Sequence, residues 1–265
     1  MAQIHPTAVI DSNAKIGEKV SIGPYCCIGA NVEIGDGVEL KAHVVIDGQT
    51  SIGADCKFFP FASIGLPPQD LKYSGEESTL TLGERNIVRE YVTMNPGTDG
   101  GGLETRVGND NLFMVGAHVA HDCIVGNNII MANNATLAGH VVIDDYAIIG
   151  GLAAVHQFCR IGRHAMIGGM SGVENDIIPY ASVLGGRASL SGLNLVGLKR
   201  RGFSKDEIKS LRVAYRQLFA EEGLLSERIA DVATQFSEVE SIMEIVEFMR
   251  AESQRGLTQP RSVNA

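Results

Sequence analysis

The sequence of 265 residues has no Trp, only 6% aromatic residues and only five Cys, none in a Cys-x-x-Cys pair. No apolar run approaches the roughly 18 residues of a membrane-spanning helix. Positive charge is also scarce, because 22 Lys and Arg face 31 Asp and Glu, for a formal net charge of −9. We therefore expect a protein with no membrane span and no general attraction to nucleic acid or to an anionic lipid surface.

Targeting and cofactor motifs are missing as well. Residues 1–7 show neither the basic start nor the apolar core of a secretion signal. An odd number of Cys without such a signal indicates reduced thiols and a cytoplasmic location. The chain contains no P-loop and no dinucleotide-binding glycine fingerprint, and we expect no cofactor.

A six-residue repeat dominates what is present. Apolar residues recur at every sixth position in three runs of eleven, three and twelve hexapeptides, starting at Ile4, Leu82 and Val107. Gly often follows the apolar residue, and the residue four positions after it is usually Ala or Cys. One bulky and one small inward residue in every six suit a triangular coil of short parallel strands, with three sides and 18 residues per turn. Twenty-six hexapeptides make about nine turns, with a spacing of about 4.8 Å between turns.

Two segments interrupt the repeat, and a third follows it. We predict a coil over residues 1–189, with inserted loops at 66–81 and 100–106 marked by Pro and Gly. Helical spacing and capping pairs, Ser204 with Glu207 and Ser237 with Glu240, predict a small α-helical domain over 190–265. Cys26, Cys56, Cys123 and Cys159 fall in the small inward slot, so we expect them to be buried and inert.

Four of the seven His lie within 39 residues of one another, at positions 118, 121, 140 and 156. Because residue n stacks on residue n − 18, His121 lies next to Gly139, and His140 lies under Phe158. We therefore expect a row of imidazoles along one edge, whereas His5, His43 and His164 are isolated and are taken as structural. A His row can serve as a general base near neutral pH, for example in acyl transfer from a thioester. It can also bind a metal, as in the zinc sites of gamma-type carbonic anhydrases, although the spacing here differs and we expect no metal.

Three motifs resemble one family closely: 118–122 (HVAHD), 133–140 (NNATLAGH) and 154–158 (AVHQF). The segments 69–73 (QDLKY) and 197–203 (GLKRRGF) look like the same family, and the likeness covers nearly the whole chain. The sequence thus resembles the acyl-[acyl-carrier-protein]–UDP-N-acetylglucosamine O-acyltransferases, whose coil is a left-handed parallel β-helix. That reaction is the first acylation of lipid A biosynthesis.

The resemblance implies a role for each matching residue. His121 would be the general base that deprotonates the sugar 3-hydroxyl, with Asp122 orienting it, and the N–H of Gly139 would stabilise the oxyanion. The remaining matches would bind substrate: His118, His140 and His156 with Asp70 and Lys72 at the sugar nucleotide, Gln69 beside them, Gln157 near the acyl donor, and Arg200 and Arg201 at phosphates.

The family further implies a homotrimer with its sites between subunits. The partners would be acyl carrier protein, which carries a 3-hydroxyacyl chain, and a UDP-sugar. Gly169 lies where the family measures acyl length, and the absence of a side chain there predicts a long chain.

Departures from the family pattern leave alternatives open. Relatives often read TIHRGT where this chain has TMNPGT over 93–98, which places Asn95 and Pro96 at changed positions, and many have His in place of Arg187. The acceptor is therefore either a sugar hydroxyl or the amine of a 3-amino analogue. The later N-acyltransferase of the same pathway usually has an extra N-terminal domain, which is not seen here. A non-catalytic scaffold and a metal-dependent hydratase are the remaining alternatives.

Overall fold

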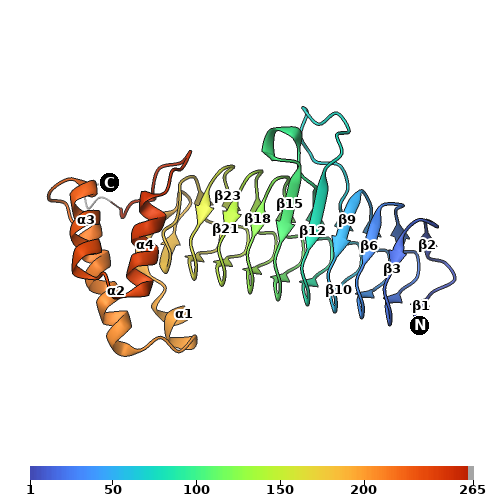
Figure 1. The fold of residues 1–265 in the computed structure, drawn as a ribbon, viewed down its shortest axis with the longest axis horizontal. Helices are drawn as coiled ribbons and strands as arrows, with labels where there is room; N and C mark the ends of the chain where they lie inside the picture. Colours follow the sequence, from blue (N-terminus) through green and yellow to red (C-terminus); the bar gives the residue numbers. More distant parts are fainter. Residues whose placement is uncertain (262–265) are drawn as a thin grey trace.

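The computed structural model describes residues 1–261. Short parallel strands wind into a three-sided coil, with the N-terminus at one end and four helices at the other (Figure 1). Residues 262–265, the end of the predicted helical domain, lie outside the described residues.

Each of the three sides of the coil is one sheet, built from one strand of each successive coil. The first sheet contains β1 (Gln3–Ile4), β4 (Ser21–Ile22), β7 (Glu39–Leu40), β10 (Lys57–Phe58), β13 (Ile87–Val88), β16 (Leu112–Phe113), β19 (Ile130–Met131), β22 (Ile148–Ile149), β25 (Met166–Ile167), β27 (Ala181–Leu184) and β28 (Ser189–Leu193). The second contains β2 (Val9–Ile10), β5 (Cys27–Ile28), β8 (Val45–Ile46), β11 (Ser63–Ile64), β14 (Thr93–Met94), β17 (His118–Val119), β20 (Thr136–Leu137), β23 (Ala154–Val155) and β26 (Gly172–Val173). The third contains β3 (Lys15–Ile16), β6 (Val32–Ile34), β9 (Gln49–Ile52), β12 (Thr79–Leu82), β15 (Glu104–Val107), β18 (Ile124–Val125), β21 (Val142–Ile143) and β24 (Arg160–Ile161).

The register of these strands follows the six-residue repeat. From β1 to β26, partners not separated by an insertion are 18 residues apart, as in His118 with Thr136 and Thr136 with Ala154. The last parallel pair, β25 with β27, is closer in sequence, with Met166 opposite Ser182. The repeated apolar residues point inward, and Phe58, Met94 and Phe113 are fully buried. Cys26, Cys56, Cys123 and Cys159 are fully buried as predicted, and burial raises the pKa of the Cys123 thiol to about 12.

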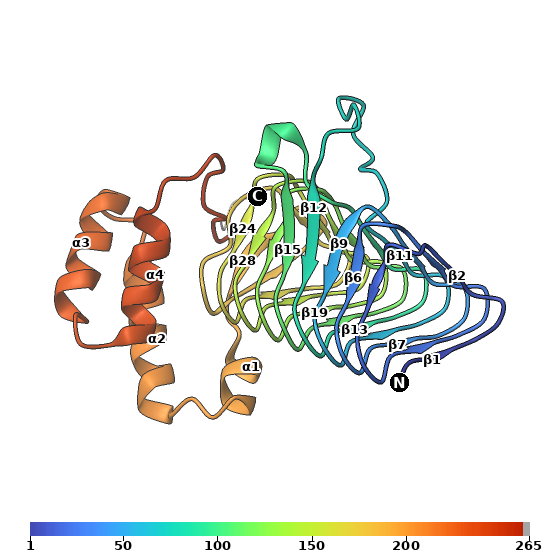
Figure 2. The same cartoon turned by 45° about the vertical axis from the view of Figure 1, so that its right-hand side comes forward.

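The two insertions project from the same side of the coil, next to β12 and β15 (Figures 1 and 2). Both end earlier than the repeat suggested, because β12 begins at Thr79 and β15 at Glu104. Residues 79–81 and 104–106 therefore belong to the coil, since they pair in register with each other and 79–81 also pair with β9. The second insertion also begins earlier than predicted, because β14 ends at Met94. It spans residues 95–103 and includes a single 3₁₀ turn, η1 (Asp99–Gly101).

The C-terminal part begins with a hairpin, because β28 pairs antiparallel with β27. The Gly- and Ser-rich segment 185–192 is thus largely strand and tight turn, and helices begin only at α1 (Leu195–Arg200), followed by α2 (Lys205–Leu218), α3 (Leu225–Gln235) and α4 (Glu240–Arg250). Ser204 caps α2 by accepting from the Glu207 N–H at 3.1 Å. The prediction for Ser237 was wrong: residues 236–238 form a turn in which the Val239 N–H donates to the Phe236 carbonyl at 2.9 Å, and α4 follows Val239 without a side-chain cap.

An aromatic cluster joins this part to the coil. The His164 ring stacks between Tyr146 at 4.8 Å and Tyr180 at 5.6 Å, and Phe203 meets it edge-on at 5.3 Å. Burial, reinforced by the positive charges of Arg201 and Arg163, lowers the pKa of His164 to about 4. His164 is therefore a structural residue, as its isolation in the sequence suggested.

We expect His164 to make the protein sensitive to acid. Because its pKa is lower in the folded state than in the unfolded state, its neutral form stabilises the fold fully above about pH 6.5. This contribution is lost as the pH falls towards 4, by about 3 kcal/mol at most. His164→Phe keeps the flat stacked ring without a titrating group, so its free energy of unfolding should fall less than that of the wild type between pH 7 and pH 4.5. Denaturant unfolding at several pH values measures this difference, and parallel pH curves for the two proteins would contradict it.

Candidate active site

The centre of the site is a pair of neighbouring residues at the corner between β17 and β18. The Nδ1 of His121 donates to Oδ2 of Asp122 at 2.6 Å. Consecutive side chains diverge along an extended strand, which argues against such a contact. Asp122, however, adopts a left-handed conformation with φ of 59°, and the corner turns both side chains to the same side. The backbone corner therefore produces the pair.

The second insertion encloses the Asp122 carboxylate. Thr98 donates to it twice, from its N–H at 2.8 Å and from Oγ1 at 2.6 Å, and the carboxylate side chain is fully buried. The backbone of Gly101 also lies directly against this carboxylate, because a Cβ there would fall 2.0 Å from Cγ of Asp122. Since the carboxylate accepts from His121 Nδ1, the His121 Nε2 is left with a lone pair and can accept a proton.

The next coil covers His121 with backbone and with a second imidazole. A Cβ on Gly139 would lie 2.4 Å from Cε1 of His121, so only glycine fits there without a shift. The His140 ring meets the His121 ring edge-on at 5.1 Å and stacks under Phe158 at 4.4 Å. Burial lowers the pKa of His140, against an opposing effect of Asp122. The expected stacking of these residues is thus present.

His118 lies on the outer face of the second sheet, one strand before the corner. Its Nδ1 is 2.7 Å from Oγ1 of Thr93, the residue that pairs with it in β14. Burial, and secondarily the charge of His121, lower its pKa. His118 and His140 therefore favour the neutral form near neutral pH, which limits positive charge around His121.

His156 and Gln157 stand at the same corner one coil beyond His140, and both are exposed. A residue from the C-terminal tail reaches them: Arg255 donates from Nη2 to His156 Nδ1 at 2.7 Å and from Nε to the Gln157 carbonyl at 2.9 Å. The sequence contained no signal for this contact, since the partners are 99 and 98 residues apart.

The first insertion brings Asp70 towards this corner. Its negative charge acts on His140, where it raises the pKa against the effect of burial. Gln69 and Lys72 are exposed on the same loop. Asn95, one of the changed positions, is buried and donates from Nδ2 to the carbonyls of Leu66 at 2.9 Å and Pro67 at 3.3 Å. The Asn side chain thus fastens the base of the loop.

Three of the expected site residues do not lie beside His121. Arg200 is the last residue of α1 and Arg201 caps its C-terminus, over the first sheet, where the Arg201 guanidinium is 4.6 Å from the centre of the Tyr146 ring. They border an apolar groove of about 670 Å³ whose floor includes Ile130, Ile148 and Met166. Gly169 is exposed at the edge between the first and second sheets. One chain by itself therefore does not bring these residues to His121.

The distances between three side chains of the site would allow a metal ion to bind. Ligand atoms of His121, Asp122 and His140 all lie within 4.8 Å of one another. The Asp122 oxygens, however, already accept three hydrogen bonds, two from Thr98 and one from His121. The donor set is therefore that of a hydrogen-bonded His–Asp pair.

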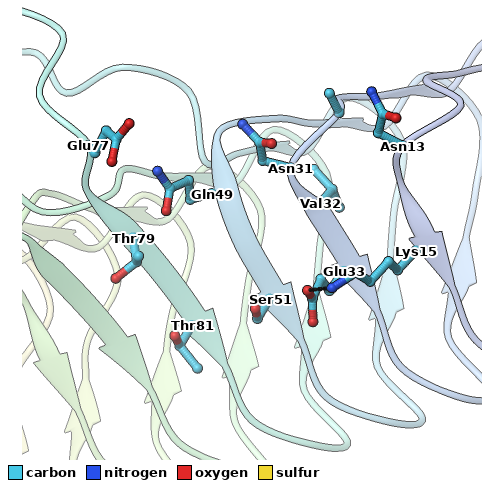
Figure 3. Close-up of a pocket in the computed structure, with 11 residues that line it drawn as sticks. Asn13, Lys15, Asn31, Val32, Glu33, Gln49, Ser51, Glu77, Thr79 and Thr81 are labelled. Carbon is cyan, nitrogen blue, oxygen red and sulfur yellow. Dashed lines mark hydrogen bonds and ion pairs between the residues drawn. The ribbon is translucent and has the colours of Figure 1, made fainter.

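A separate polar groove of about 580 Å³ lies on the outer face of the third sheet (Figure 3). Its walls are Asn, Gln, Ser and Thr side chains with an exposed Lys15–Glu33 ion pair, and Glu77 of the first insertion stands at its rim. None of the His residues lines it. Exposed pairs of this kind contribute little energy, and the groove does not belong to the His–Asp site.

Comparison with known proteins agrees with the coil. The family profile of bacterial transferase hexapeptides (six repeats) matches residues 1–36 and 13–48. The profile of UDP-N-acetylglucosamine O-acyltransferase domain 2 matches residues 176–258. The coil is thus that of the hexapeptide-repeat acyltransferases, the left-handed β-helix predicted from the sequence.

Full-length relatives define the family. The acyl-[acyl-carrier-protein]–UDP-N-acetylglucosamine O-acyltransferase of Rhizobium johnstonii is 46% identical over 98% of this chain and 95% of its own, and that of Sinorhizobium fredii is 49% identical over 98% and 96%. The crystal structure of the Francisella novicida UDP-N-acetylglucosamine acyltransferase superposes with a TM-score of 0.95 at 38% identity, covering 98% of this chain and 95% of that one. The chain belongs to the acyl-[acyl-carrier-protein]–UDP-N-acetylglucosamine O-acyltransferase family.

We expect Gly139→Ala to displace the His121 imidazole, because the added Cβ would overlap the ring. Nitrogen NMR of the His side chains should then show loss of the strong Nδ1–H hydrogen bond to Asp122. Gly151→Ala is the matched control, since its Cβ would meet nothing closer than 3.4 Å. An unchanged His121 signal in the Gly139 variant would contradict the packing described.

Proposed function

We propose that this protein transfers a 3-hydroxyacyl chain from acyl carrier protein to the 3-position of UDP-N-acetylglucosamine, as the first acylation of lipid A biosynthesis. Family membership at 46–49% identity over nearly the whole chain supports the activity. The observation that carries the mechanism is the buried His121–Asp122 pair, in which the His121 Nε2 has no hydrogen bond within the described part of the chain and can accept a proton.

The chemistry follows from this pair. His121 Nε2 takes the proton of the sugar hydroxyl while the oxygen attacks the thioester carbonyl. The positive charge that develops on the imidazole is stabilised by the Asp122 carboxylate. When the tetrahedral intermediate collapses, the C–S bond breaks and the imidazolium returns the proton to the leaving thiolate. The products are the acylated sugar and the carrier thiol.

The Gly139 N–H is suited to the developing oxyanion. Its neighbours Ala138 and His140 donate their N–H groups to the carbonyls of Val155 and His121. No hydrogen bond involves the Gly139 N–H among the described residues. A backbone donor next to His121 and free of other partners is the arrangement that stabilises such an anion.

We place the acyl chain along the outer face of the second sheet. Successive coils carry Thr136, Ala154 and Gly172 there in register, so the side chains become smaller along the face away from His118. Gly169 stands at the edge of this surface near Gly172. A surface of small side chains that ends at Gly169, where no side chain blocks it, leaves room for a long chain.

Replacing Gly169 by Met should therefore shorten the preferred acyl chain, because the new side chain fills the end of this path. Competition between carrier-bound 3-hydroxyacyl chains of several lengths, read by mass spectrometry, measures the preference. An unchanged chain-length profile would discard this role for Gly169.

We further propose that the protein acts as a homotrimer in the cytoplasm. The edge between the first and second sheets exposes large apolar side chains along much of its length, including Tyr91 at 60%, Leu152 at 61% and Met170 at 73%. Patches of this extent are usually covered by a partner. Packing the second sheet of one subunit against the first sheet of the next would also bring the next subunit's Arg200 and Arg201 to the His residues. None of the described helices is long and apolar enough to cross a membrane.

Subunit sharing makes a direct prediction. His121→Ala and Arg200→Ala should each be nearly inactive alone, yet mixed trimers formed by co-expression should regain part of the activity, because some interfaces contain both intact residues. Activity of tandem-purified mixed trimers is the measurement. If mixing restores no activity, the two residues belong to the same chain's site or to different functions.

The exposed basic segment 199–201 is proposed to meet acidic groups of the acyl carrier protein or the phosphates of the nucleotide. In a protein of net charge −9, such a local cluster provides a docking point for an acidic carrier.

The central test is removal of the base. His121→Ala should reduce kcat at least about a hundredfold, the usual contribution of general acid–base catalysis, with folding intact. Thr98→Val should reduce it by about tenfold, since a hydrogen bond to a charged group is lost, whereas Thr98→Ser keeps that bond.

Purified protein is assayed with UDP-N-acetylglucosamine and with its 3-amino analogue, and the favoured acceptor decides between ester and amide formation. Near-full activity of His121→Ala would indicate a scaffold, and stoichiometric zinc would indicate a hydratase.

A further inference from the structure

The C-terminal tail contributes a residue to the site corner. After α4 the chain turns back along the coil, where the Asp176 N–H donates to the Gly256 carbonyl and the Thr258 N–H to the Asp176 carbonyl, both at 2.9 Å. Thr258 Oγ1 also donates to the Asn175 carbonyl at 3.3 Å. These contacts hold Arg255 against the coil, although the segment has no regular secondary structure of its own.

The contact between Arg255 and His156 determines which nitrogen carries the imidazole proton. A guanidinium has only donors and remains charged in proteins. Because its Nη2 lies 2.7 Å from His156 Nδ1, this nitrogen must be the acceptor. The Gln157 carbonyl, 3.3 Å from the same Nδ1, is itself an acceptor and is already bonded to Arg255 Nε. His156 is therefore neutral, with its hydrogen on Nε2.

At the same corner, the Nε2 atoms of His156 and His121 thus have opposite hydrogen-bonding roles. The Nδ1 of His121 donates to Asp122, so its Nε2 is an acceptor, whereas the Nδ1 of His156 accepts from Arg255, so its Nε2 is a donor. His156 stacks two coils above Ala120, the residue before His121, which places it about 10 Å along the corner. A sugar ring and its attached phosphate can span this separation.

We infer that Arg255 is a positioning residue that holds His156 as a neutral Nε2–H donor to the diphosphate of the UDP-sugar. The inference rests on the proposed function and extends it to a residue far away in the sequence. Arg255 also adds a positive charge beside this donor, which favours a doubly charged diphosphate on a protein that is acidic overall. The acyl thioester is neutral and gains nothing from that charge.

Steady-state kinetics of Arg255→Ala tests this assignment. We expect KM for UDP-N-acetylglucosamine to rise about tenfold, with kcat changed less than about threefold and KM for the acyl carrier protein unchanged. Arg255→Lys keeps the charge but cannot bridge both partners, so it should lie between. Arg250→Ala, an exposed Arg at the end of α4, is the matched control and should behave as wild type.

A double-mutant cycle separates positioning from simple loss of structure. His156→Ala should raise the same KM, His156→Gln should largely restore it because its amide offers an N–H donor, and Arg255→Ala should add little in the His156→Ala background. Nitrogen NMR of the wild type should show the His156 hydrogen on Nε2, and Arg255→Ala should lose that fixed assignment.

Several outcomes would overturn the inference. They are an unchanged UDP-sugar KM in Arg255→Ala, a shift in the carrier KM instead, and fully additive effects in the cycle. Failure of the proposed function is distinguishable, because the wild type itself would then transfer no acyl chain.

Discussion

Nearly everything in this molecule depends on the parallel register that stacks each residue on the one 18 positions earlier. Backbone hydrogen bonds between coils impose this register, and the inward apolar residues maintain it, because a slip by one position would turn every buried side chain outward. The same register brings Asp122, His140 and Phe158 into one column and His121, Gly139 and Gln157 into the next. The register that aligns the core residues therefore also aligns the residues of the site.

The insertions modify this regular frame only where the site needs it. The second insertion covers the Asp122 carboxylate with Thr98 and the Gly101 backbone, which removes water from a charge that accepts from His121 and also acts on His140. The first insertion is fastened by Asn95, at one of the positions where the sequence was expected to depart from the family pattern. A rigid coil with two fitted loops can orient groups closely without a large hydrophobic domain around them.

The His row and the pair Arg200 and Arg201 lie far apart within one chain. Both belong to motifs shared with the family, yet in one chain they lie on different sides of the prism. A site divided between subunits, as proposed above, would couple assembly to activity. The apolar edge exposed by Leu152 and Met170 is consistent with such an assembly.

The sequence alone determined the coil, the number of residues per turn, the inward Cys, the stacking of Gly139 on His121 and the stacking of Phe158 on His140. All of these follow from a strict six-residue period. The period is visible in the local sequence, and the backbone hydrogen bonds between coils place residues that are 18 positions apart next to each other. It also identified the region of each insertion but placed both ends three residues too far, because the apolar period marks only the last residue of β12 and β15.

Tertiary structure alone decided the contacts that no period encodes. The left-handed corner brings Asp122 to His121, the second insertion folds Thr98 onto that carboxylate, and the tail carries Arg255 across 99 residues to His156. Likewise α4 begins after Val239, at the end of a turn over residues 236–238, and Ser237 does not cap it. In each case the deciding interaction joins segments far apart in the chain or turns on a single backbone angle, so neither residue spacing nor local propensity could reveal it.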